Sequence, residues 1–450
     1  MKNHSYLLGL LLLLQAMSCK KYLEEKPSIK LGVPTSVEDY QSLLDQYNVM
    51  SDRDASSGEA SAGEFYLTDA DYNARDEEDR RMYTWQNSRV YKAGGNEWGY
   101  TYSSIYSANS VIEAWEALPD TDKQSLKWRD VAGQAFLIRA KCYLTLATIW
   151  CKAYDPNTSA NLPGIPLRLN TNFSEVSIRA SLEASYSQVI TDLKKSVTLL
   201  PITPLHVVRA SKPAAYGLLA RTYLWMRQYE NCRLYADSCL MLKKDLINFN
   251  TLTASATYPV SQFNTEVIMA NKMGVIVPIL SPSRARVNPE VYALYDNNDL
   301  RKTIFFKIAS GITTFKGSYA GSGALFCGVA TDEVYLMRAE SRCRSGNING
   351  ALADLNLLLS NRYKTGTFTI YNSTDQAQLL NIIVKERRKE LFGRGLRWPD
   401  MKRLNEEGAG ISLSRIIAGT IYSLPAKSSR FAMPIPEDIL QLSGIFQNSY

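Results

Sequence analysis

Residues 331–363 carry the pattern that most constrains the fold, because they have the spacing of two helices joined by a short turn. From 332 to 345 apolar residues recur every three or four positions, which places them along one face of a helix. A Ser-Gly-Asn turn follows, and Gly and Asn tolerate the left-handed backbone that ends many helices. A second apolar run begins at Ala351, twelve residues after Ala339, and these small residues allow close approach. The segment is therefore predicted to be an antiparallel helical hairpin.

The spacing of this hairpin resembles a tetratricopeptide (TPR) repeat, a helix pair that recurs about every 34 residues. A second copy is predicted at 212–242, where Ala220 takes the place of Ala339, and a looser copy starts at 134–150. The partner of this last helix is predicted at 181–200, after a loop that contains proline. The copies are irregular and far apart, so we predict a mostly α, TPR-like scaffold with long insertions. Such a scaffold does not by itself specify a function.

The composition is that of an ordinary globular protein with ample core, at 45% hydrophobic and 21% charged residues in 450. The net charge is +7, but the basic residues are spread along the chain, so nucleic acid is not an expected partner. The 27 tyrosines and 7 tryptophans suit surfaces that stack on ligands. Tyrosine also fills helical cores, and the composition leaves both uses open.

Residues 1–18 have the features of a secretory signal: Lys2, an apolar run at 6–14 and small residues before Cys19. The run is too short to span a bilayer as a permanent helix. It resembles a bacterial lipoprotein signal, in which cleavage leaves Cys19 as a lipidated N-terminus, although Ala16 stands where Leu is usual. The alternative is an ordinary signal in which Cys19 is incidental. We expect a mature protein that is anchored by lipid rather than embedded.

Few residues suit catalysis or metal binding. The chain has two histidines, and because His4 lies in the signal, the mature protein keeps His206 alone. Zinc sites built on two or more histidines are therefore excluded, and a Ser-His-Asp or Cys-His enzyme would depend on this single residue. The sequence has no Cys-x-x-Cys and no Walker pattern. We therefore predict no cofactor, no metal and no enzymatic activity.

Residues 69–80 begin like a calcium-binding EF-hand loop. Ala74 stands at the sixth position and Arg80 at the twelfth, where the loop needs Gly and Glu. The EF-hand interpretation therefore fails. A calcium site built differently from the acidic residues of this segment stays an alternative, as does an unmarked pair of glycosidase carboxylates.

A series of motifs, in the right order along the chain, resembles the SusD-like (RagB/SusD) family of outer-membrane nutrient-binding lipoproteins. Two departures are Arg394, where the family usually has Glu, and Pro399, where an aromatic residue is common. The motifs are Lys20-Lys-Tyr-Leu-Glu24, Trp98-x3-Tyr102-x2-Ile105-x3-Asn109, Phe136-x2-Arg139-Ala140-x2-Tyr143, Lys212-Pro-Ala-Ala-Tyr-Gly217, Asp332-Glu-Val-Tyr-Leu-Met-Arg-Ala-Glu340, Glu386-Arg-Arg-Lys-Glu-Leu391, Gly395-x-Arg397-Trp398-x-Asp400, Met433-Pro-Ile-Pro436 and the closing Gln447-Asn-Ser-Tyr450.

The resemblance implies one SusD-like domain over 19–450, with about four TPR-like helix pairs and a loop-rich, minor-β ligand face built from 51–100 and 250–330. Residues 331–450 would form the C-terminal SusD/RagB region. The protein would lie on the outer membrane, facing outwards, and deliver a glycan to a SusC-like TonB-dependent porin. Binding, not catalysis, is the implied role. The alternatives are a RagB-like oligopeptide-binding lipoprotein and a TPR-type scaffold for protein interactions.

In glycan-binding members of this family, aromatic rings stack on sugar faces while Asn and Arg bind hydroxyl groups. By this resemblance the candidate ligand-binding residues are aromatic and polar residues of the two loop-rich segments. In the first segment they are Trp85, Arg89, Tyr91, Asn96, Trp98 and Tyr100; in the second they are Arg284, Tyr295 and Tyr319.

Some motif residues have a structural interpretation instead. Trp98 suits packing better than ligand binding, although it stays among the candidates. Arg387, Glu390, Arg397 and Asp400 have helical spacings that allow ion pairs, and we predict that they brace the C-terminal helix against the repeats.

Overall fold

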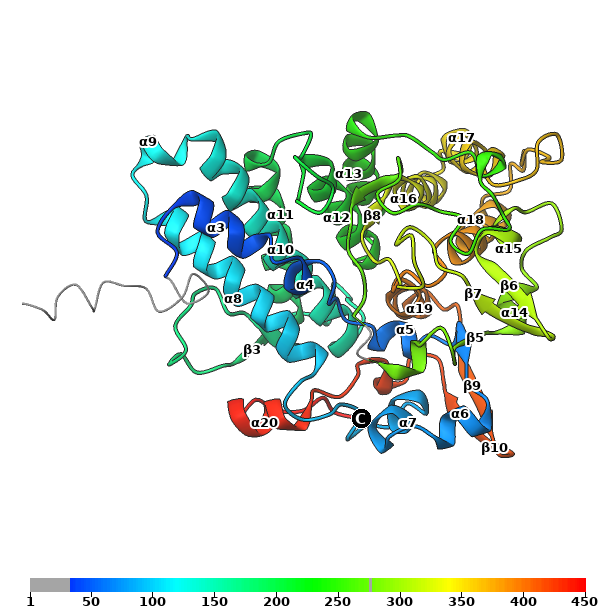
Figure 1. Cartoon of the computed structure of the whole chain (residues 1–450), viewed down its shortest axis with the longest axis horizontal. Helices are drawn as coiled ribbons and strands as arrows, with labels where there is room; N and C mark the ends of the chain where they lie inside the picture. Colours follow the sequence, from blue (N-terminus) through cyan, green and yellow to red (C-terminus); the bar gives the residue numbers. More distant parts are fainter. Residues whose placement is uncertain (1–32, 275–276) are drawn as a thin grey trace, which may run out of the picture. The chain divides into compact units, whose positions relative to one another are not determined.

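A computed structural model describes residues 33–274 and 277–450. Residues 43–450 pack together as one unit. Figure 1 shows this unit as a mostly helical structure with a few short strands. The long helices are α8 (Glu97–Glu116), α10 (Leu126–Trp150), α11 (Leu182–Leu199), α12 (Lys212–Trp225), α13 (Tyr229–Leu242), α16 (Thr331–Arg344), α17 (Ile348–Ser360), α18 (Gln376–Glu390) and α19 (Arg397–Glu406).

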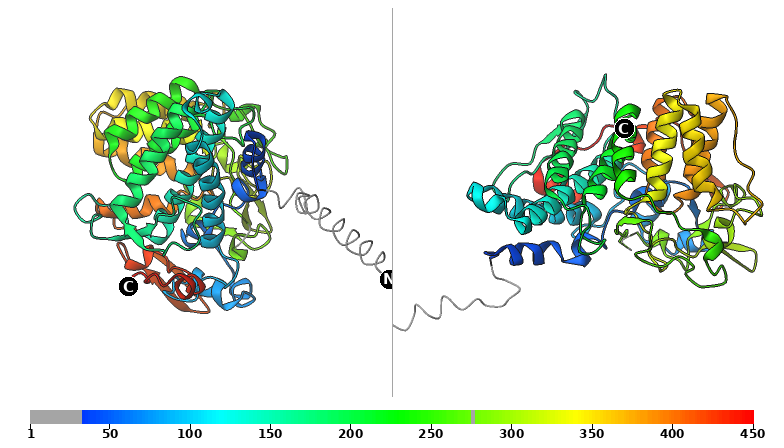
Figure 2. Two further views of the ribbon diagram at one scale, coloured as in Figure 1. Left: turned by 90° about the vertical axis from the view of Figure 1, so that its left-hand side faces the viewer. Right: turned by 90° about the horizontal axis from the view of Figure 1, so that it is seen from above.

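The long helices pack as successive pairs. Helix α10 packs against both α8 and α11, α12 packs against α13, and α13 packs against α16. Helix α16 also contacts α17 and α18, and Figure 2 shows these three as neighbouring yellow and orange helices. Ala339 on α16 and Ala351 on α17 are both fully buried, as the hairpin pattern requires. The predicted mostly α, TPR-like fold is confirmed.

Capping residues explain where two of these helices begin. The Ser211 hydroxyl accepts a hydrogen bond from the Ala214 amide, with Pro213 in the first turn, so α12 starts where the sequence indicates. Helix α8 starts at Glu97 because the Asn96 side chain accepts a hydrogen bond from the amide of Gly99. Helix α10 begins at Leu126, earlier than the motif at 134–150 indicates.

The strands form five two-stranded antiparallel pairs in the described residues. The pair of β1 and β5 joins the early segment 51–100 to the insertion at 250–330, because Phe65 lies opposite Val287. The pairs are β1 (Phe65–Tyr66) with β5 (Arg286–Val287), β2 (Pro163–Pro166) with β3 (Arg179–Ser181), β4 (Val267–Met269) with β8 (Val329–Ala330), β6 (Phe306–Ala309) with β7 (Ile312–Phe315), and β9 (Leu413–Ile417) with β10 (Thr420–Leu424).

Short helices occupy much of what the sequence presents as loop. No helix in the described part of the chain has both the length and the apolar content that a bilayer crossing requires. The short helices are α3 (Val37–Leu44), α4 (Tyr47–Met50), α5 (Ser57–Ser61), α6 (Asp69–Asn73), α7 (Glu77–Tyr83), α9 (Asp120–Lys123), α14 (Pro289–Tyr292), α15 (Arg301–Ile304) and α20 (Glu437–Ser443), with single 3-10 turns η1 (Phe249–Thr251), η2 (Pro278–Leu280) and η3 (Ser429–Phe431).

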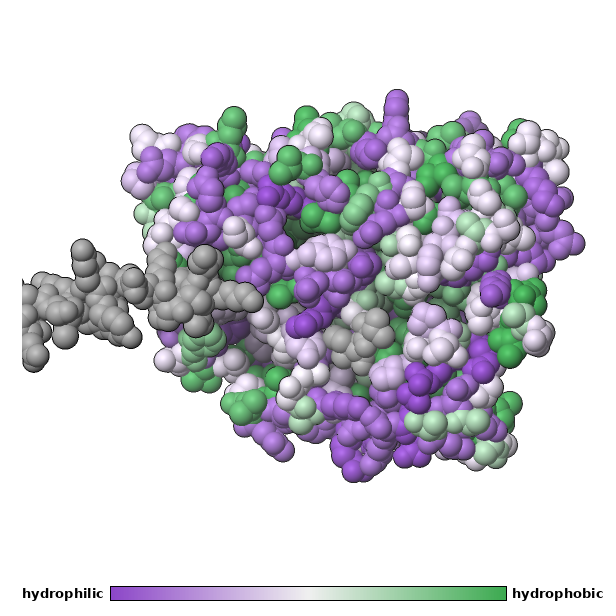
Figure 3. All heavy atoms as spheres, viewed as in Figure 1, coloured by the Kyte–Doolittle hydropathy of each residue, from purple (hydrophilic) through white to green (hydrophobic). Residues whose placement is uncertain are grey.

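Two apolar clusters form the core. The larger one fills the space between the long helices and includes Trp150 and Trp398. The smaller one lies under the 250–330 insertion, where Phe306 and Phe392 meet edge to face with ring centroids 5.1 Å apart. The surface differs from this core. The face in Figure 3 shows hydrophobic residues scattered among polar ones rather than gathered in one continuous patch.

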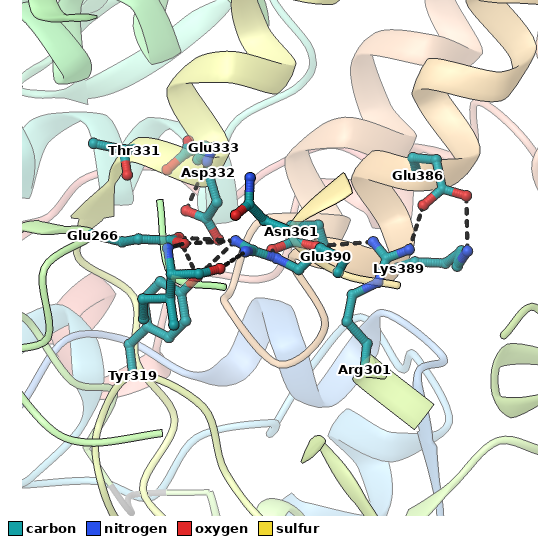
Figure 4. Close-up of polar contacts among 12 residues, drawn as sticks. Glu266, Arg301, Tyr319, Thr331, Asp332, Glu333, Asn361, Glu386, Lys389 and Glu390 are labelled. Carbon is teal, nitrogen blue, oxygen red and sulfur yellow. Dashed lines mark hydrogen bonds and ion pairs between the residues drawn. The ribbon is translucent and has the colours of Figure 1, made fainter. Parts of the chain in front are cut away.

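A buried network of charges joins the insertion to the C-terminal helices (Figure 4). Arg301 pairs with Glu386 at 2.6 Å and with Glu390 at 2.9 Å. Arg362, at the end of the α16–α17 hairpin, pairs with Glu390 at 2.7 Å and with Glu266 at 2.8 Å. All five of these side chains are at most 4% exposed. Because water does not reach them, each charge is stabilised by its partners in the network.

The predicted bracing role is found for the motif residues, with one difference in partners. Arg387 on α18 bonds Asp400 on α19 at 2.7 Å. Glu390 binds the two arginines of the buried network instead of a neighbour on its own motif. Arg397 lies 3.7 Å from Glu64, so the C-terminal helices are also tied to the N-terminal segment.

Candidate ligand-binding site

A hollow of about 470 Å³ opens between α8, the loop at 166–177 and α20. Its volume is within the range of small-molecule binding sites. The residues that line it are mainly apolar and aromatic, with a few polar groups from the loop. Those used below are Trp98, Tyr102, Ile105, Tyr106, Asn109, Arg168, Asn170, Phe173, Glu175, Ile439 and Leu442.

One face of α8 supplies the first wall. Trp98, Tyr102, Ile105, Tyr106 and Asn109 follow one another at helical spacing, so all five side chains lie on one stripe. The Trp98 ring packs at 5.3 Å both from Tyr102 and, edge to face, from Trp150 in the core. Because Trp98 is 3% exposed, it forms the floor of the hollow and the later residues of the stripe form its wall.

The loop at 166–177 forms the second wall, and hydrogen bonds from α8 hold it in place. The Asn109 amide donates to the carbonyls of Arg168 and Asn170 at 2.8 and 3.0 Å. The Glu113 carboxylate accepts from the Thr171 amide at 2.8 Å. Tyr102 donates through its hydroxyl to the carbonyl of Pro166, at 2.7 Å. The wall is therefore fixed before any ligand arrives, which reduces the entropy that binding costs.

Two stacked rings mark the mouth of the hollow. Tyr106 and Phe173 have ring centroids 4.8 Å apart and planes inclined by 25°. Phe173 is 81% exposed, and so is most of Leu442 on α20, at 84%. Such a surface is the kind on which a sugar ring places its C–H face or a peptide its apolar side chain.

Polar groups at the same edge bind one another in the structure. Asn170 donates to the Glu175 carboxylate at 2.8 Å, and Arg168 donates to the carbonyl of Glu175 at 2.5 Å. Glu175 is exposed, so its oxygens can accept from a ligand hydroxyl as well. The arrangement can bind a neutral ligand through ring stacking and a few hydrogen bonds.

The six predicted residues of segment 51–100 have different places in the structure. Trp98 lines the hollow. Trp85 is buried, and its indole donates to the carbonyl of Ser61 at 3.0 Å. Tyr91 is also buried, with its hydroxyl 3.0 Å from that of Ser57, and burial raises the pKa of Tyr91 well above its usual value.

The other three lie beside the start of α8. Asn96 caps this helix and donates to Asp438 of α20 at 3.1 Å. Arg89 is exposed and pairs with Glu77 at 3.0 Å. Tyr100 is half-buried, beneath the guanidinium of Arg53 at 4.3 Å. These three residues lie near α8, which forms a wall of the hollow. Their contact with a ligand stays a prediction.

The residues predicted in the second segment lie apart from the hollow. Tyr295 and Tyr319 are each 1% exposed in the smaller core cluster. Tyr295 donates to the carbonyl of Lys389 at 2.8 Å, and Tyr319 donates to the Glu266 carboxylate. Arg284 is half-buried near β5. The structure therefore does not bring the two predicted sets into one site, and ligand binding by these three residues stays a prediction.

Sequence reasoning missed the loop wall and the exposed ring pair. Tyr106 had a usable signal, since it lies eight residues after Trp98 on the same stripe of α8. Phe173 and Asn170 had none, because their place depends on how the loop folds back onto α8. As for metals, the described residues contain no group of three His, Cys, Asp or Glu side chains placed to hold an ion.

Two family models match the sequence. A SusD-like model described as starch-binding and associating with the outer membrane matches residues 21–224, and the SusD family model matches 332–438. Together the matches cover more than half of the chain. The chain belongs to the SusD-like family. This family consists of carbohydrate-binding proteins, not enzymes, that associate with the outer membrane.

Solved SusD-like structures share the fold. A Bacteroides vulgatus protein provisionally described as sugar-binding superposes with a TM-score of 0.76 at 18% identity, over 93% of this chain and 99% of its own. A SusD superfamily protein from Bacteroides thetaiotaomicron superposes with a TM-score of 0.73 at 19% identity, over 92% of this chain and 100% of its own. A SusD-like carbohydrate-binding protein from Bacteroides vulgatus superposes with a TM-score of 0.68 at 20% identity, over 91% of this chain and 97% of its own. Among curated proteins, none matches the sequence significantly.

The SusD-like match bears on the hollow directly. Both of its main walls, α8 and the loop at 166–177, lie inside the matched range 21–224. The second match ends at residue 438, in the first turn of α20. The hollow is therefore built largely from segments that the SusD-like models recognise.

Proposed function

We propose that this SusD-like protein binds a neutral glycan in the hollow between α8, the loop at 166–177 and α20. The observation that carries the proposal is the exposed, stacked pair Tyr106 and Phe173 above a wall fixed by Asn109. A pyranose has an apolar C–H face that suits such rings, and its hydroxyl edges suit Asn170 and Glu175 at the rim. Binding occurs without turnover, and the protein acts as a carrier.

The membrane role extends this proposal. Cys19 becomes the lipidated N-terminus of a single SusD-like domain over 19–450, after removal of residues 1–18, and it holds the protein on the outer surface of the outer membrane. Cys19 and the signal lie outside the described residues. A SusC-like TonB-dependent porin is the transporter that receives the ligand. The match to a family described as associating with the outer membrane supports this placement.

An oligopeptide ligand is the second candidate. It is favoured by the number of aliphatic side chains around the hollow, among them Ile105, Ile439 and Leu442. These side chains would accept the apolar side chains of a peptide. A glycan has no aliphatic side chains that could pack there.

Calorimetry with the signal-free protein separates the two candidates. The titrants are a panel of neutral polysaccharides (amylopectin, arabinoxylan and galactomannan) and a mixture of oligopeptides. Heat of binding with a polysaccharide and none with the peptides supports the glycan proposal. Heat with peptides alone overturns it in favour of the second candidate, and no heat with any titrant contradicts both.

A further inference from the structure

A second concave surface, here called the α18 groove, lies on different elements from the hollow. It has a volume of about 690 Å³ and is bordered by the segment at 363–373, which joins α17 to α18, by the start of α18 and by the turn at 296–298. No residue that lines this groove also lines the hollow. The groove residues that matter here are Asp296, Tyr363, Phe368, Tyr371, Asn372 and Gln378.

Two asparagine side chains hold the segment at 363–373 in a fixed shape. Asn356 donates to the carbonyl of Tyr371 and accepts from its amide, both at 2.8 Å. At the other end Asn250 donates to the carbonyl of Tyr363 at 2.9 Å and accepts from the amide of Thr365 at 3.0 Å. The groove is therefore preformed rather than a chance shape of a loose loop.

Three aromatic rings lie along this segment. The Phe368 ring is 5.2 Å from that of Tyr363 and 6.2 Å from that of Tyr371. Phe368 and Tyr371 are half-buried, so part of each ring is available at the surface. Rings of this kind, set along one side of a shallow groove, offer faces on which flat apolar surfaces can stack.

The polar groups of the groove are amides and hydroxyls rather than charges. Asp296 is the one ionisable carboxylate among the lining residues, and its oxygens already accept hydrogen bonds from the Tyr363 hydroxyl at 2.9 Å and the Asn298 amide at 2.8 Å. Asn372 and Gln378 are exposed. Amides both donate and accept, which matches a hydroxyl group, and the lining contains no Lys or Arg that would bind an anion.

From this combination we propose that the α18 groove is a second binding site for a neutral glycan, separate from the hollow. Phe368 and Tyr371 supply the stacking surface, and Asn372 and Gln378 bind the hydroxyl groups. The inference rests on the proposed function, since both sites take the same class of ligand. The two sites lie on different elements of one chain and share no lining residue, so each can be tested separately.

Hydrogen–deuterium exchange tests the groove independently of the hollow. The signal-free protein is measured with and without each of amylopectin, arabinoxylan and galactomannan, both as wild type and as the hollow variant Tyr106→Ala/Phe173→Ala. We expect slower exchange in segment 363–373 with at least one polysaccharide in both proteins. Slower exchange in 166–177 alone overturns the groove but leaves the proposed function intact. No protection in either segment contradicts both, and protection of 363–373 by oligopeptides alone overturns the glycan assignment.

A double variant adds a quantitative test. Asn372→Ala/Gln378→Ala removes two exposed amides, together with the 2.6 Å hydrogen bond that the Gln378 side-chain oxygen accepts from the Ser373 hydroxyl, and no core contact, so the fold is retained. We expect affinity electrophoresis to show roughly tenfold weaker binding to the polymer that protects 363–373, as for the loss of two ordinary hydrogen bonds. The matched control Asn161→Ala/Gln262→Ala removes two exposed amides outside both sites and should bind like wild type. Equal binding by the two double variants would overturn the groove.

Discussion

Arg139 donates a hydrogen bond of 3.0 Å to the amide oxygen of Asn109, and this bond decides which way the Asn109 side chain faces. With its oxygen bound to the guanidinium, Asn109 presents its NH2 group to the carbonyls of Arg168 and Asn170. Arg139 is itself fixed by a bidentate pair with Asp192, at 2.7 and 2.8 Å. Side chains from α8, α10 and α11 thus form a chain of bonds that ends at the wall of the hollow.

Loss of Asn109 should loosen that wall. Asn109→Ala removes both hydrogen bonds to the loop, so we expect faster hydrogen exchange in 166–177 and glycan binding that is several-fold weaker. The control is Ser110→Ala: the Ser110 hydroxyl donates to the carbonyl of Tyr106 within α8 itself, at 3.1 Å, so its loss should change neither property. Unchanged exchange of the loop in Asn109→Ala would show that the two bonds from Asn109 do not position it.

Replacement of Glu59 by Gln should make stability less sensitive to pH. Glu59 is 2% exposed; its carboxylate accepts from the Gly395 amide at 2.9 Å, and burial together with the nearby Glu64 raises its pKa to about 8. Because the folded pKa lies above the ordinary value of 4.5, the folded protein loses stability as pH rises from about 4.5 to about 8.

Thermal unfolding measured from pH 5 to pH 9 checks this expectation. Glu59→Gln keeps the acceptor for Gly395 and removes the charge. It should unfold like wild type near pH 5 and be more stable near pH 9, where each unit of raised pKa accounts for about 1.4 kcal/mol. A difference between the two proteins that does not grow with pH would contradict the account.

The buried network should be costly to break at Arg362. Arg362→Met leaves Glu266 and Glu390 without one of their partners in a site closed to water, and we expect a loss of about 3–5 kcal/mol in the free energy of unfolding. The control Arg233→Met removes a more exposed arginine that pairs with Glu230, and should cost less than about 1 kcal/mol. Denaturant unfolding of both variants gives the comparison. Equal losses of unfolding free energy in the two variants would mean that burial does not make the network's ion pairs more costly to break.

Membrane attachment should depend on Cys19. We expect Cys19→Ala, expressed with its signal, to fold normally but to be absent from the outer-membrane fraction, because a lipid chain is the proposed anchor. Fractionation followed by immunoblotting measures this. A variant that still sediments with outer membranes would be held there by something other than a lipid at residue 19.

The fold could be predicted from the sequence to the extent that local patterns determine it. The apolar spacing around Ala339 and Ala351 led to the α16–α17 hairpin, and the matching pattern around Ala220 led to the α12–α13 pair. These features are local, since a helix shows its buried face in its own periodicity. The motif from Trp98 to Asn109, which the family resemblance singled out, lies on α8 and lines the hollow, and periodicity does not reveal that role.

The site itself was harder to predict, because burial depends on partners far along the chain. Trp85 and Tyr319 look like ligand-binding residues in a loop-rich sequence, yet one bonds a distant carbonyl and the other a buried carboxylate. Phe173 looks unremarkable beside them, yet it is 81% exposed on a loop that Asn109 and Glu113 hold against α8. Composition identifies aromatic residues but does not tell which of them reach the surface.

The most direct test of the account is a calorimetric titration of the signal-free protein with the polysaccharide that binds it, compared with Tyr106→Ala/Phe173→Ala. The control is Tyr258→Ala, which removes an aromatic ring that is 48% exposed and lies outside both proposed sites. If the hollow binds the glycan, the double variant keeps the wild-type melting temperature and loses at least about tenfold in affinity, while the control binds normally. Wild-type affinity in the double variant would contradict the central claim.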